Sequence, residues 1–509
     1  MLRAGQQHFG GVVFVIGRTG GSSVMSNTIR FILDGQIKEM REIEPTLTVL
    51  NYLREVERRT GTKEGCAEGD CGACTVAIGE RDGDRILYRA INSCIQFVPT
   101  LDGKELVTVE SLKRDGELHP VQRAMVECHG SQCGFCTPGF VMSLFTLYHN
   151  DKNPNRETID DCLAGNLCRC TGYRPIVAAA ARMQELGAKD QFHAREAATL
   201  KQLQAIERAD TLALVWRDRK YFAPKSLDDF AKLVADHPDA VLLAGGTDVG
   251  LWVTKQHRKL ATMIYTGDVA ALHGVEIGDV FVEIGAAVSY TDAAAALAAE
   301  YPDFGEMLRR LGSVQVRNAG TMGGNVGNAS PIGDSPPLLV ALGATLILRR
   351  GTATREMPVA DFFLAYRKTA LVPGEFIEAI RVPRARPDLQ FRAYKISKRF
   401  DQDISAVCGA FALKLEGSRV ADIRIAFGGM AATPKRAAQA EETLLGQIWN
   451  DAAARNAMRA LDRDFQPIGD MRASAEYRQK VARNLLLKFF LETAGKPGAT
   501  RVIARKEAA

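Results

Sequence analysis

The stretch that decides the fold reads Cys66-Ala67-Glu68-Gly69-Asp70-Cys71-Gly72-Ala73-Cys74 and is followed, further along, by Asn92-Ser93-Cys94. Its cysteines have the spacing C-x4-C-x2-C plus a distant fourth, which is typical of a plant-type ferredoxin loop around a 2Fe-2S cluster. Glycines let such a loop wrap tightly and point N–H groups at the cluster sulfurs. We therefore predict that Cys66, Cys71, Cys74 and Cys94 bind iron. Structural zinc fits less well, because zinc ribbons repeat C-x2-C.

A second set of four cysteines lies further along the chain. Cys133 and Cys136 occur as C-x2-C, and Cys168 and Cys170 occur as C-x-C. Each half offers two thiolates, so the two halves must meet in space to complete a four-sulfur site. Spacing alone leaves iron and zinc open here, because both metals accept such pairs. The other three cysteines are expected to be inert buried thiols: Cys128, Cys162 and Cys408.

Length and composition set the outer limits. A chain of 509 residues is expected to form several domains. With 46% hydrophobic and 25% charged residues the composition is that of a globular protein, and a net charge of +5 without a long basic run favours neither nucleic acid nor membrane as partner. No apolar run approaches the roughly 20 residues of a membrane span. Reduced, metal-binding cysteines predict a cytoplasmic protein.

The two cysteine sets, in this order, resemble the iron-sulfur half of the molybdenum hydroxylases, the family that includes xanthine dehydrogenase. The segments that carry the resemblance are Cys133-Gly134-Phe135-Cys136-Thr137-Pro138-Gly139 and Cys168-Arg169-Cys170-Thr171-Gly172-Tyr173. The resemblance extends over nearly the whole chain from about residue 26. It implies a 2Fe-2S cluster in each set. It also implies that Gln132, directly before Cys133, contacts the pterin of a molybdenum cofactor on a partner chain.

Patterns along the first half predict two cluster domains. Residues 1–25 are expected to be a disordered extension. Alternating apolar residues from Ile29, a turn at Asp34-Gly35 and a helix capped by Thr48 predict a β-grasp ferredoxin domain over 26–109. Residues 110–187 are predicted to form a four-helix bundle around the second set. Three of its helices open at a proline, and the fourth covers 157–163. Residues 188–217 are interpreted as a linker with some helical content.

Two glycine clusters mark the second half. Residues 241–244 predict a buried strand that leads into Gly245-Gly246-Thr247-Asp248, a turn suited to a phosphate, although an ordinary tight turn fits equally well. The second cluster, 320–337, is expected to be neither helix nor strand, because its glycines and prolines weaken both, and to lie against a ligand. The chain has no G-x-G-x-x-G motif, so a Rossmann dinucleotide site is not indicated.

Both glycine clusters resemble FAD-binding segments of the molybdenum hydroxylases and of flavoproteins of the vanillyl-alcohol-oxidase type. The resemblance implies an α+β FAD-binding domain over 218–386 and an α/β C-terminal domain over 387–500. Asp334 would accept a hydrogen bond from the polar side chain of the flavin, and the loop with Lys398, Arg399, Asp401 and Asp403 would lie beside its ring. The implied FAD contacts are Leu242, Leu243, Ala244, Gly245, Gly246, Thr247, Asp248, Val249, Leu311, Thr321, Gly324, Asn325, Ser330, Asp334, Ile377 and Lys395.

The resemblance implies an oxidoreductase that relays electrons and holds no hydroxylating residue of its own. Clusters and flavin fused in this order resemble the small subunit of the bacterial xanthine dehydrogenases. A large subunit with the molybdenum cofactor would oxidise hypoxanthine and xanthine to urate, NAD would accept the electrons, and two small and two large subunits would form a heterotetramer. The same relay for an aldehyde, an N-heterocycle or another acceptor stays open. A maturation protein that keeps the fold without electron transfer is a further alternative, but it should have lost cluster or flavin residues, and all eight cysteines and both glycine clusters are present. A free-standing ferredoxin reductase should have a Rossmann-type NAD motif, which the sequence lacks.

Overall fold

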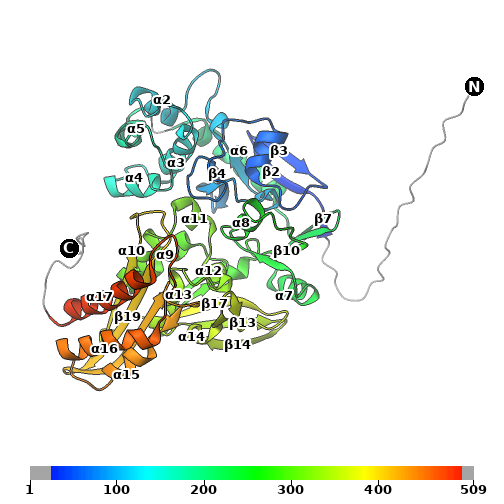
Figure 1. The fold of residues 1–509 in the computed structure, drawn as a ribbon. Helices are drawn as coiled ribbons and strands as arrows, with labels where there is room; N and C mark the ends of the chain where they lie inside the picture. The colour runs from blue at the N-terminus through cyan, green and yellow to red at the C-terminus, as the bar shows by residue number, and fades with distance from the viewer. Residues whose placement is uncertain (1–24, 188, 496–509) are drawn as a thin grey trace, which may run out of the picture.

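The computed structural model describes residues 25–187 and 189–495. The extension predicted over residues 1–25 lies outside this range, apart from Met25. In Figure 1 the blue and cyan cluster domains lie together above the green-to-red flavin part of the chain. Among the described residues, no helix has both the length and the apolar character that a membrane span requires.

The ferredoxin domain is a mixed sheet in the order β3-β2-β6-β4-β5. The hairpin between the first two strands turns at Asp34 and Gly35, whose φ angles of 53° and 72° fit the predicted two-residue turn. Thr48 caps the predicted helix by accepting a hydrogen bond from the backbone of Asn51. Both predictions are confirmed. The elements are β2 (Ile29–Leu33), β3 (Gln36–Met40), α1 (Val49–Asn51), which continues as a π-helix over Tyr52–Val56, β4 (Thr75–Asp82), β5 (Arg85–Asn92) and β6 (Glu105–Val107).

The helical domain contains the four predicted helices. They are α2 (Pro120–Glu127), α3 (Thr137–Asn150), α4 (Arg156–Leu163) and α5 (Arg174–Glu185). Proline lies in the first turn of three of them, where its missing N–H leaves no bond unmade. Helix α3 is buried along most of its length and packs against β4 and β5 of the ferredoxin domain. The two cluster domains therefore share one hydrophobic core.

Much of the segment interpreted as a linker is regular structure that packs back on the ferredoxin domain. Helix α6 (Gln191–Ile206) donates from Gln202 to the carbonyl of Gly35 at 2.8 Å. Arg208 follows, with Nε 2.6 Å from Asp102 Oδ2, and both side chains are buried. Strand β7 (Thr211–Trp216) then pairs in parallel with the short β1 (Met25–Ser26). A mixed, Ala-rich sequence gives little local signal for contacts of this kind.

The described part of the flavin domain has two five-stranded sheets, ordered β1-β7-β8-β10-β9 and β11-β12-β17-β13-β14, and a two-stranded sheet, β15-β16. Apart from β1 and β7, its strands are β8 (Arg219–Ala223), β9 (Val241–Leu243), β10 (Thr262–Tyr265), β11 (Val275–Ile277), β12 (Phe281–Gly285), β13 (Thr345–Arg350), β14 (Ala353–Pro358), β15 (Phe363–Ala365), β16 (Lys368–Thr369) and β17 (Phe376–Pro383). Its helices are α7 (Leu227–Asp236), α8 (Val249–Thr254), α9 (Tyr290–Glu300), α10 (Pro302–Arg309), α11 (Val314–Ala319), α12 (Met322–Asn328), α13 (Ser335–Leu342) and α14 (Val359–Phe362).

The prediction that residues 320–337 form neither helix nor strand is wrong. Helix α12 occupies the middle of this run, and α13 begins within it. Thr321 caps α12 by accepting a hydrogen bond from Gly324 N at 2.9 Å. Met322 and Val326 are fully buried in the domain core, so tertiary packing offsets the low helix propensity of the glycines.

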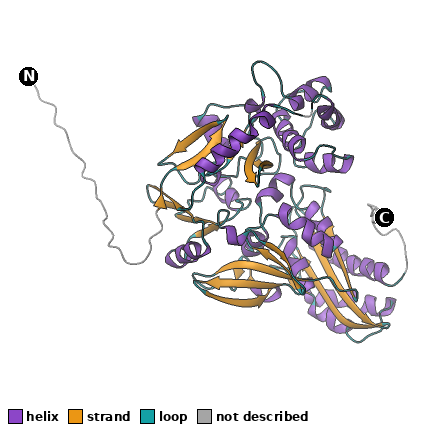
Figure 2. Cartoon of the chain, turned by 180° about the vertical axis from the view of Figure 1, so that it is seen from behind, coloured by secondary structure: helices purple, strands orange, loops and turns teal. Residues whose placement is uncertain are grey.

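The C-terminal domain is an antiparallel sheet, β18-β19-β20-β21, with helices on its outer face. Alternate residues of β19 serve the two faces: Phe411 and Leu413 join the helices, whereas Ala410 and Ala412 join the core of the flavin domain. Figure 2 shows the long strands and their helices from behind. The elements are β18 (Leu389–Ile396), β19 (Val407–Glu416), β20 (Arg419–Gly428), β21 (Lys435–Arg436), α15 (Ala438–Leu444), α16 (Asp451–Asp464) and α17 (Ala475–Thr493).

Candidate cofactor sites

The first cysteine loop wraps around its own sulfurs. The backbone N–H groups of Asp70 and Cys71 each lie 3.3 Å from Cys66 Sγ, and Cys66 N lies 3.3 Å from Cys71 Sγ. Gly69 and Gly72 have φ angles of 80° and 69°, which side chains rarely allow. The loop therefore presents donors to sulfur, as a site for an anionic cluster requires.

The structure brings the four thiols of the first set together. Hydrogen bonds from the side chains of Cys71 and Cys94 lower the pKa of Cys66, and one from Cys94 lowers the pKa of Cys74. The same contacts raise the pKa of Cys71 and of Cys94. Cys74 and Cys94 are 1% and 2% exposed, so this set is closed to solvent on one side.

The second set comes together from two distant segments, as the spacing required. Cys136 contacts Cys168, and Cys133 contacts Cys170. Burial and the Cys168 contact raise the pKa of Cys136 to about 12. Burial opposes the shift of Cys168, but hydrogen bonds from the side chain and backbone of Thr171 lower its pKa. Cys133 and Cys170 are exposed, so this site lies at the surface.

The sulfurs of neither set are gathered as closely as a tetrahedral zinc site would require. Among the described residues, one group of three possible ligand atoms lies entirely within 4.8 Å, and it consists of His119, His149 and Asp190. No three sulfurs of either cysteine set lie that close together. A tetrahedral zinc site would place its sulfurs about 3.8 Å apart, given Zn–S bonds of about 2.3 Å. In the second set the sulfurs contact in two pairs, Cys136 with Cys168 and Cys133 with Cys170, which suits a 2Fe-2S cluster, in which each iron takes two thiolates.

The histidine group is itself explained by hydrogen bonding. Val121 N donates to His119 Nδ1 at 3.2 Å, so His119 Nε2 carries the proton and donates to Asp190. His149 Nε2 lies 2.9 Å from the same carboxylate oxygen. A protonated Nε2 is not a metal ligand. These side chains join α2, α3 and the start of α6, which no sequence motif indicated.

The two cysteine loops touch each other, and the first also touches the flavin domain. Leu167 N donates to the carbonyl of Cys71 at 3.0 Å, one residue before Cys168. On the other side, the Thr254 hydroxyl at the end of α8 donates to the carbonyl of Ala67 at 2.8 Å. Along these two contacts the order is second site, first site, flavin domain, and α11 of the flavin domain also contacts the loop before Cys168 directly. Each step is a direct contact between segments.

Gln132 lies at the outer end of this order. Its side chain is exposed beside the exposed Cys133. Phe135 is 48% exposed and Tyr173 is 38% exposed, so apolar surface borders the site. Such a surface can pack against a second molecule.

The two glycine clusters meet although they are far apart in sequence. A Cβ atom on Gly245 would lie 1.6 Å from the carbonyl oxygen of Ala319, and one on Gly324 would lie 3.5 Å from the Cβ atom of Ala244. The predicted strand is β9, and the predicted helix after the turn is α8. Backbone of the two clusters therefore forms one continuous surface. A ligand with phosphates can approach such backbone closely.

Asp248 supplies a test of whether FAD fits this surface. Its Oδ2 atom is buried and has no hydrogen-bond partner. Burial raises the pKa of Asp248, and the charge of Arg367, on the turn between β15 and β16, opposes the rise. A free carboxylate oxygen beside backbone donors suits a ligand with both hydroxyls and phosphates, as FAD has. Arg367 lies in no motif and was not predicted.

Asp334 and Lys395 form a buried ion pair at the N-terminal end of α13. Lys395 Nζ donates to Asp334 Oδ2 at 2.5 Å, and Ser405 Oγ donates to Oδ1 at 2.5 Å. A hydrogen bond from flavin, as predicted, would use the remaining lone pairs of this carboxylate. Asn325 Oδ1 accepts from Ser335 at 2.8 Å. Three further predicted FAD contacts already have partners within the protein. Ser330 Oγ accepts a hydrogen bond from Ile332 N at 3.4 Å, and the side chains of Leu311 and Ile377 are buried in the core of the flavin domain.

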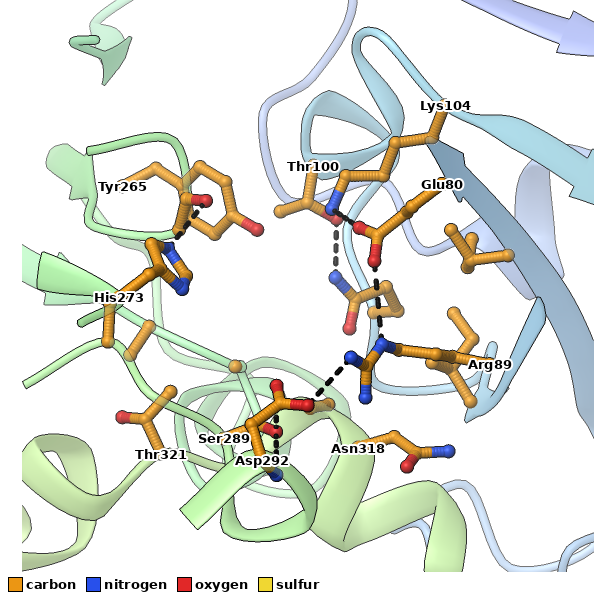
Figure 3. Close-up of a pocket in the computed structure, with 18 residues that line it drawn as sticks. Glu80, Arg89, Thr100, Lys104, Tyr265, His273, Ser289, Asp292, Asn318 and Thr321 are labelled. Carbon is orange, nitrogen blue, oxygen red and sulfur yellow. Dashed lines mark hydrogen bonds and ion pairs between the residues drawn. The ribbon is translucent and has the colours of Figure 1, made fainter. Parts of the chain in front are cut away.

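A polar cavity of about 230 Å³ lies between the ferredoxin and flavin domains (Figure 3). Of the predicted FAD contacts, Ala244, Gly245 and Thr321 line it. Its charges are paired: Lys104 lies 2.6 Å from Glu80 within the ferredoxin domain, and Arg89 lies 2.7 Å from Asp292 across the interface. Burial lowers the pKa of His273, which faces them. Contacts between domains of this kind have no local sequence signal.

Comparison with known proteins accounts for most of the chain. Residues 31–97 match the family model for a 2Fe-2S iron-sulfur cluster binding domain, and 108–181 match that for a [2Fe-2S] binding domain. Residues 217–385 match the FAD binding domain in molybdopterin dehydrogenase, and 392–493 match the CO dehydrogenase flavoprotein C-terminal domain.

Individual relatives agree with the family models. The chain is 33% identical to a xanthine dehydrogenase of Emericella nidulans over 91% of this chain and 38% of that protein, and 32% identical to xanthine dehydrogenase 2 of Arabidopsis thaliana over 87% and 38%. It thus spans less than half the length of these relatives. Among solved structures, a carbon monoxide dehydrogenase chain from Hydrogenophaga pseudoflava is similar with a TM-score of 0.50 and 29% identity, over 52% of this chain and 93% of that one.

Two 2Fe-2S domains, an FAD-binding domain and its C-terminal partner thus follow one another in this chain, in which the cluster loops and the flavin segments are in direct contact. The chain is an oxidoreductase component that belongs to the molybdenum hydroxylase family.

Proposed function

We propose that this chain is the electron-transfer subunit of a xanthine dehydrogenase. It would receive electrons from a partner chain that carries the molybdenum cofactor and oxidises hypoxanthine and xanthine to urate, and it would deliver them to NAD. The observation that carries the proposal is the order of these contacts: an exposed second cysteine site, a more buried first site in contact with it, and flavin-domain segments in contact with the first site.

Each part of the chain has a task in this proposal. Cys133, Cys136, Cys168 and Cys170 would hold the cluster nearest the partner, and the exposed Gln132 would reach the pterin. The set from Cys66 to Cys94 would hold the second cluster, inside the molecule. The peptide contact between Cys71 and Leu167 would connect the two sites.

The flavin end is proposed on the same grounds. Backbone of the two glycine clusters would hold the phosphates of FAD, and Asp248 would accept a hydrogen bond from one of its hydroxyls. Clusters of this type carry one electron at a time, whereas bound FAD collects two and can transfer a hydride to NAD. The loop from Lys398 to Asp403 would border the entry of NAD.

Xanthine is proposed as the substrate of the assembly because of the relatives. Xanthine dehydrogenases from a fungus, a plant and flies are 30–33% identical over most of this chain. The part of those enzymes that lies beyond the matched length would correspond to the large partner subunit. Two copies of each chain are proposed to form the complex.

The decisive experiment is an anaerobic titration of the purified chain with NADH. Iron, zinc and released flavin are quantified first, and the visible spectrum is then followed. We expect about four irons and one FAD per chain, and joint bleaching of flavin and clusters. Bleaching by dithionite but not by NADH would be consistent with electron transfer between the clusters and FAD, and it would exclude NAD as the acceptor.

The partner and substrate need a second measurement. Co-purification with the large subunit and addition of xanthine should reduce the clusters without NADH, whereas the isolated chain should not respond. A complex that responds to an aldehyde or a quinoline but not to xanthine would reassign the substrate. Zinc in place of iron, or the absence of flavin, would refute the relay itself.

A further inference from the structure

Gln315 of the flavin domain contacts the place where the two cysteine loops meet. It lies in the first turn of α11 and is 1% exposed. Its side-chain nitrogen lies 3.2 Å from Thr75 Oγ1, 3.1 Å from Ser143 Oγ and 3.1 Å from Asn166 Oδ1. These acceptors belong to β4 of the ferredoxin domain, to α3, and to the loop that leads into the second pair of the second set. One amide thus joins three domains.

Asn166 transmits this contact to both cysteine loops. Its side-chain nitrogen donates to the carbonyl of Gly72 at 3.0 Å, within the first loop. The next residue, Leu167, donates its backbone N–H to the carbonyl of Cys71. The position of Asn166 therefore determines whether the two loops remain hydrogen-bonded to each other.

The fit around the Gln315 amide is close. A Cβ atom on Gly165 would lie 1.9 Å from Gln315 Oε1, and one on Gly72 would lie 2.2 Å from the carbonyl of Gly165. The amide nitrogen faces three oxygens, which sets the orientation of the amide group. The three acceptors are also bonded to one another, because Ser143 Oγ donates to Asn166 Oδ1 at 2.7 Å and Asn166 Nδ2 donates to Thr75 Oγ1 at 3.2 Å. Such a connected buried network stabilises one arrangement of the three domains.

We propose that Gln315 is a positioning residue for electron transfer between the two clusters. The inference rests on the proposed function, because it needs a 2Fe-2S cluster in each set. By holding Asn166, Gln315 keeps Leu167 bonded to Cys71 and so fixes the separation of the clusters. In the transfer one electron leaves one cluster and enters the other, with no bond or proton exchanged.

The test compares Gln315→Met in the full chain with a matched control, Asn318→Ala. Methionine keeps the length of the side chain and removes the donors. Asn318 lies on the same helix and also crosses to the ferredoxin domain, where its Nδ2 donates to the carbonyl of Ala90 at 2.9 Å. Three quantities are measured: iron content, hydrogen exchange of the Leu167 amide, and the dipolar splitting between the clusters in the electron paramagnetic resonance spectrum of the fully reduced protein.

We expect Gln315→Met to keep about four irons. The Leu167 amide should exchange about tenfold faster, because a lost buried hydrogen bond shifts local opening on that scale. The splitting should shrink as the clusters separate. Asn318→Ala should leave both signals unchanged, and Gln315→Glu, which places an oxygen against the three acceptors, should reproduce the faster exchange.

Wild-type exchange and splitting in Gln315→Met would overturn the proposal. So would a wild-type Leu167 amide that exchanges as fast as an unprotected one, a result that needs no variant to fold. A wild-type chain that binds no iron would instead refute the proposed function, while the effect of Gln315 on the Leu167 amide could still be measured.

Discussion

The two cysteine sites use equal numbers of thiols in opposite settings. The first is held by one glycine-rich loop and a strand end, and its last two cysteines are almost fully buried. The second is assembled from the ends of helices, and two of its cysteines are exposed. The comparison teaches that cysteine spacing defines the ligand set, whereas the surrounding domains decide which site can face a partner. Exposure, rather than the number of thiols, is what distinguishes the two sites.

The sharpest way to break this comparison is to remove one ligand from each site. Cys94→Ser and Cys170→Ser should each lower the iron content from about four to about two per chain. Cys94→Ser should also lower the free energy of unfolding by about 2 kcal/mol more, because its hydroxyl is buried without a designed partner. Iron analysis and urea denaturation measure both effects.

Cys162 provides the control for these variants. Its thiol donates to the carbonyl of Ser143 at 3.3 Å, a bond that serine can also make. Cys162→Ser should keep all the iron. Loss of iron in this control, or full iron in Cys94→Ser, would show that the ligand sets are wrongly assigned.

Alkylation of the iron-free protein tests the difference in burial directly. Cys133 and Cys170 should react with iodoacetamide about a hundredfold faster than Cys74 and Cys94, because the buried pair reacts only after a local opening of about 3 kcal/mol. Mass spectrometry of peptides follows each site over time. The same peptides labelled in urea give the reference rates, and equal rates in the folded protein would contradict the assigned burial.

The helical domain should respond to acid through His149. Burial lowers the pKa of His149, although its hydrogen bond to Asp190 raises it. The unfolded chain therefore binds more protons as the pH falls below about 6.5, so the free energy of unfolding should decrease there. The titratable groups that face His149 are Tyr88, His119, Tyr148, Asp190 and His193.

Denaturation curves between pH 7 and pH 5 measure this dependence. His149→Gln retains a donor for Asp190 and cannot titrate, so its curve should be flatter. An unchanged acid slope in this variant would assign the effect to another group.

The smallest effect is expected where the first loop meets the flavin part of the chain. Arg399 lies 3.6 Å from Asp70, and both side chains are substantially exposed. Arg399→Ala should therefore change the free energy of unfolding by about 0.5 kcal/mol or less. A loss above about 2 kcal/mol in urea denaturation would show that this loop fixes the first site, and Lys398→Ala serves as the neighbouring control.

Local signals predicted much of the architecture. The turn at Asp34-Gly35 and the helix-opening prolines depend on backbone conformations that a few adjacent residues determine. Cysteine spacing also predicted which sulfurs meet, because four are needed and two short segments supply them. The wrong prediction for α12 has the opposite origin: glycine content argued against a helix, but the buried Met322 and Val326 stabilise it.

The contacts between domains could not be predicted from the sequence. Gln315 bonds to Thr75, Ser143 and Asn166, which lie far from it in the chain, and its own surroundings contain no motif. The same holds for the pairing of Arg89 with Asp292 across the cavity. Such pairs depend on how finished domains pack, which periodicity and spacing do not encode.

The buried pair of Arg208 and Asp102 has a consequence for how the chain is made and where it can be cut. On the ribosome the ferredoxin domain emerges first, but its Asp102 carboxylate stays without its guanidinium until Arg208 has been synthesised, after the whole helical domain. A fragment that ends at residue 109 would lack Arg208 and would leave the Asp102 carboxylate with the backbone N–H of Arg30 as its remaining partner. An excised electron carrier should therefore extend past residue 208, and a split gene should divide there rather than between the two cluster domains.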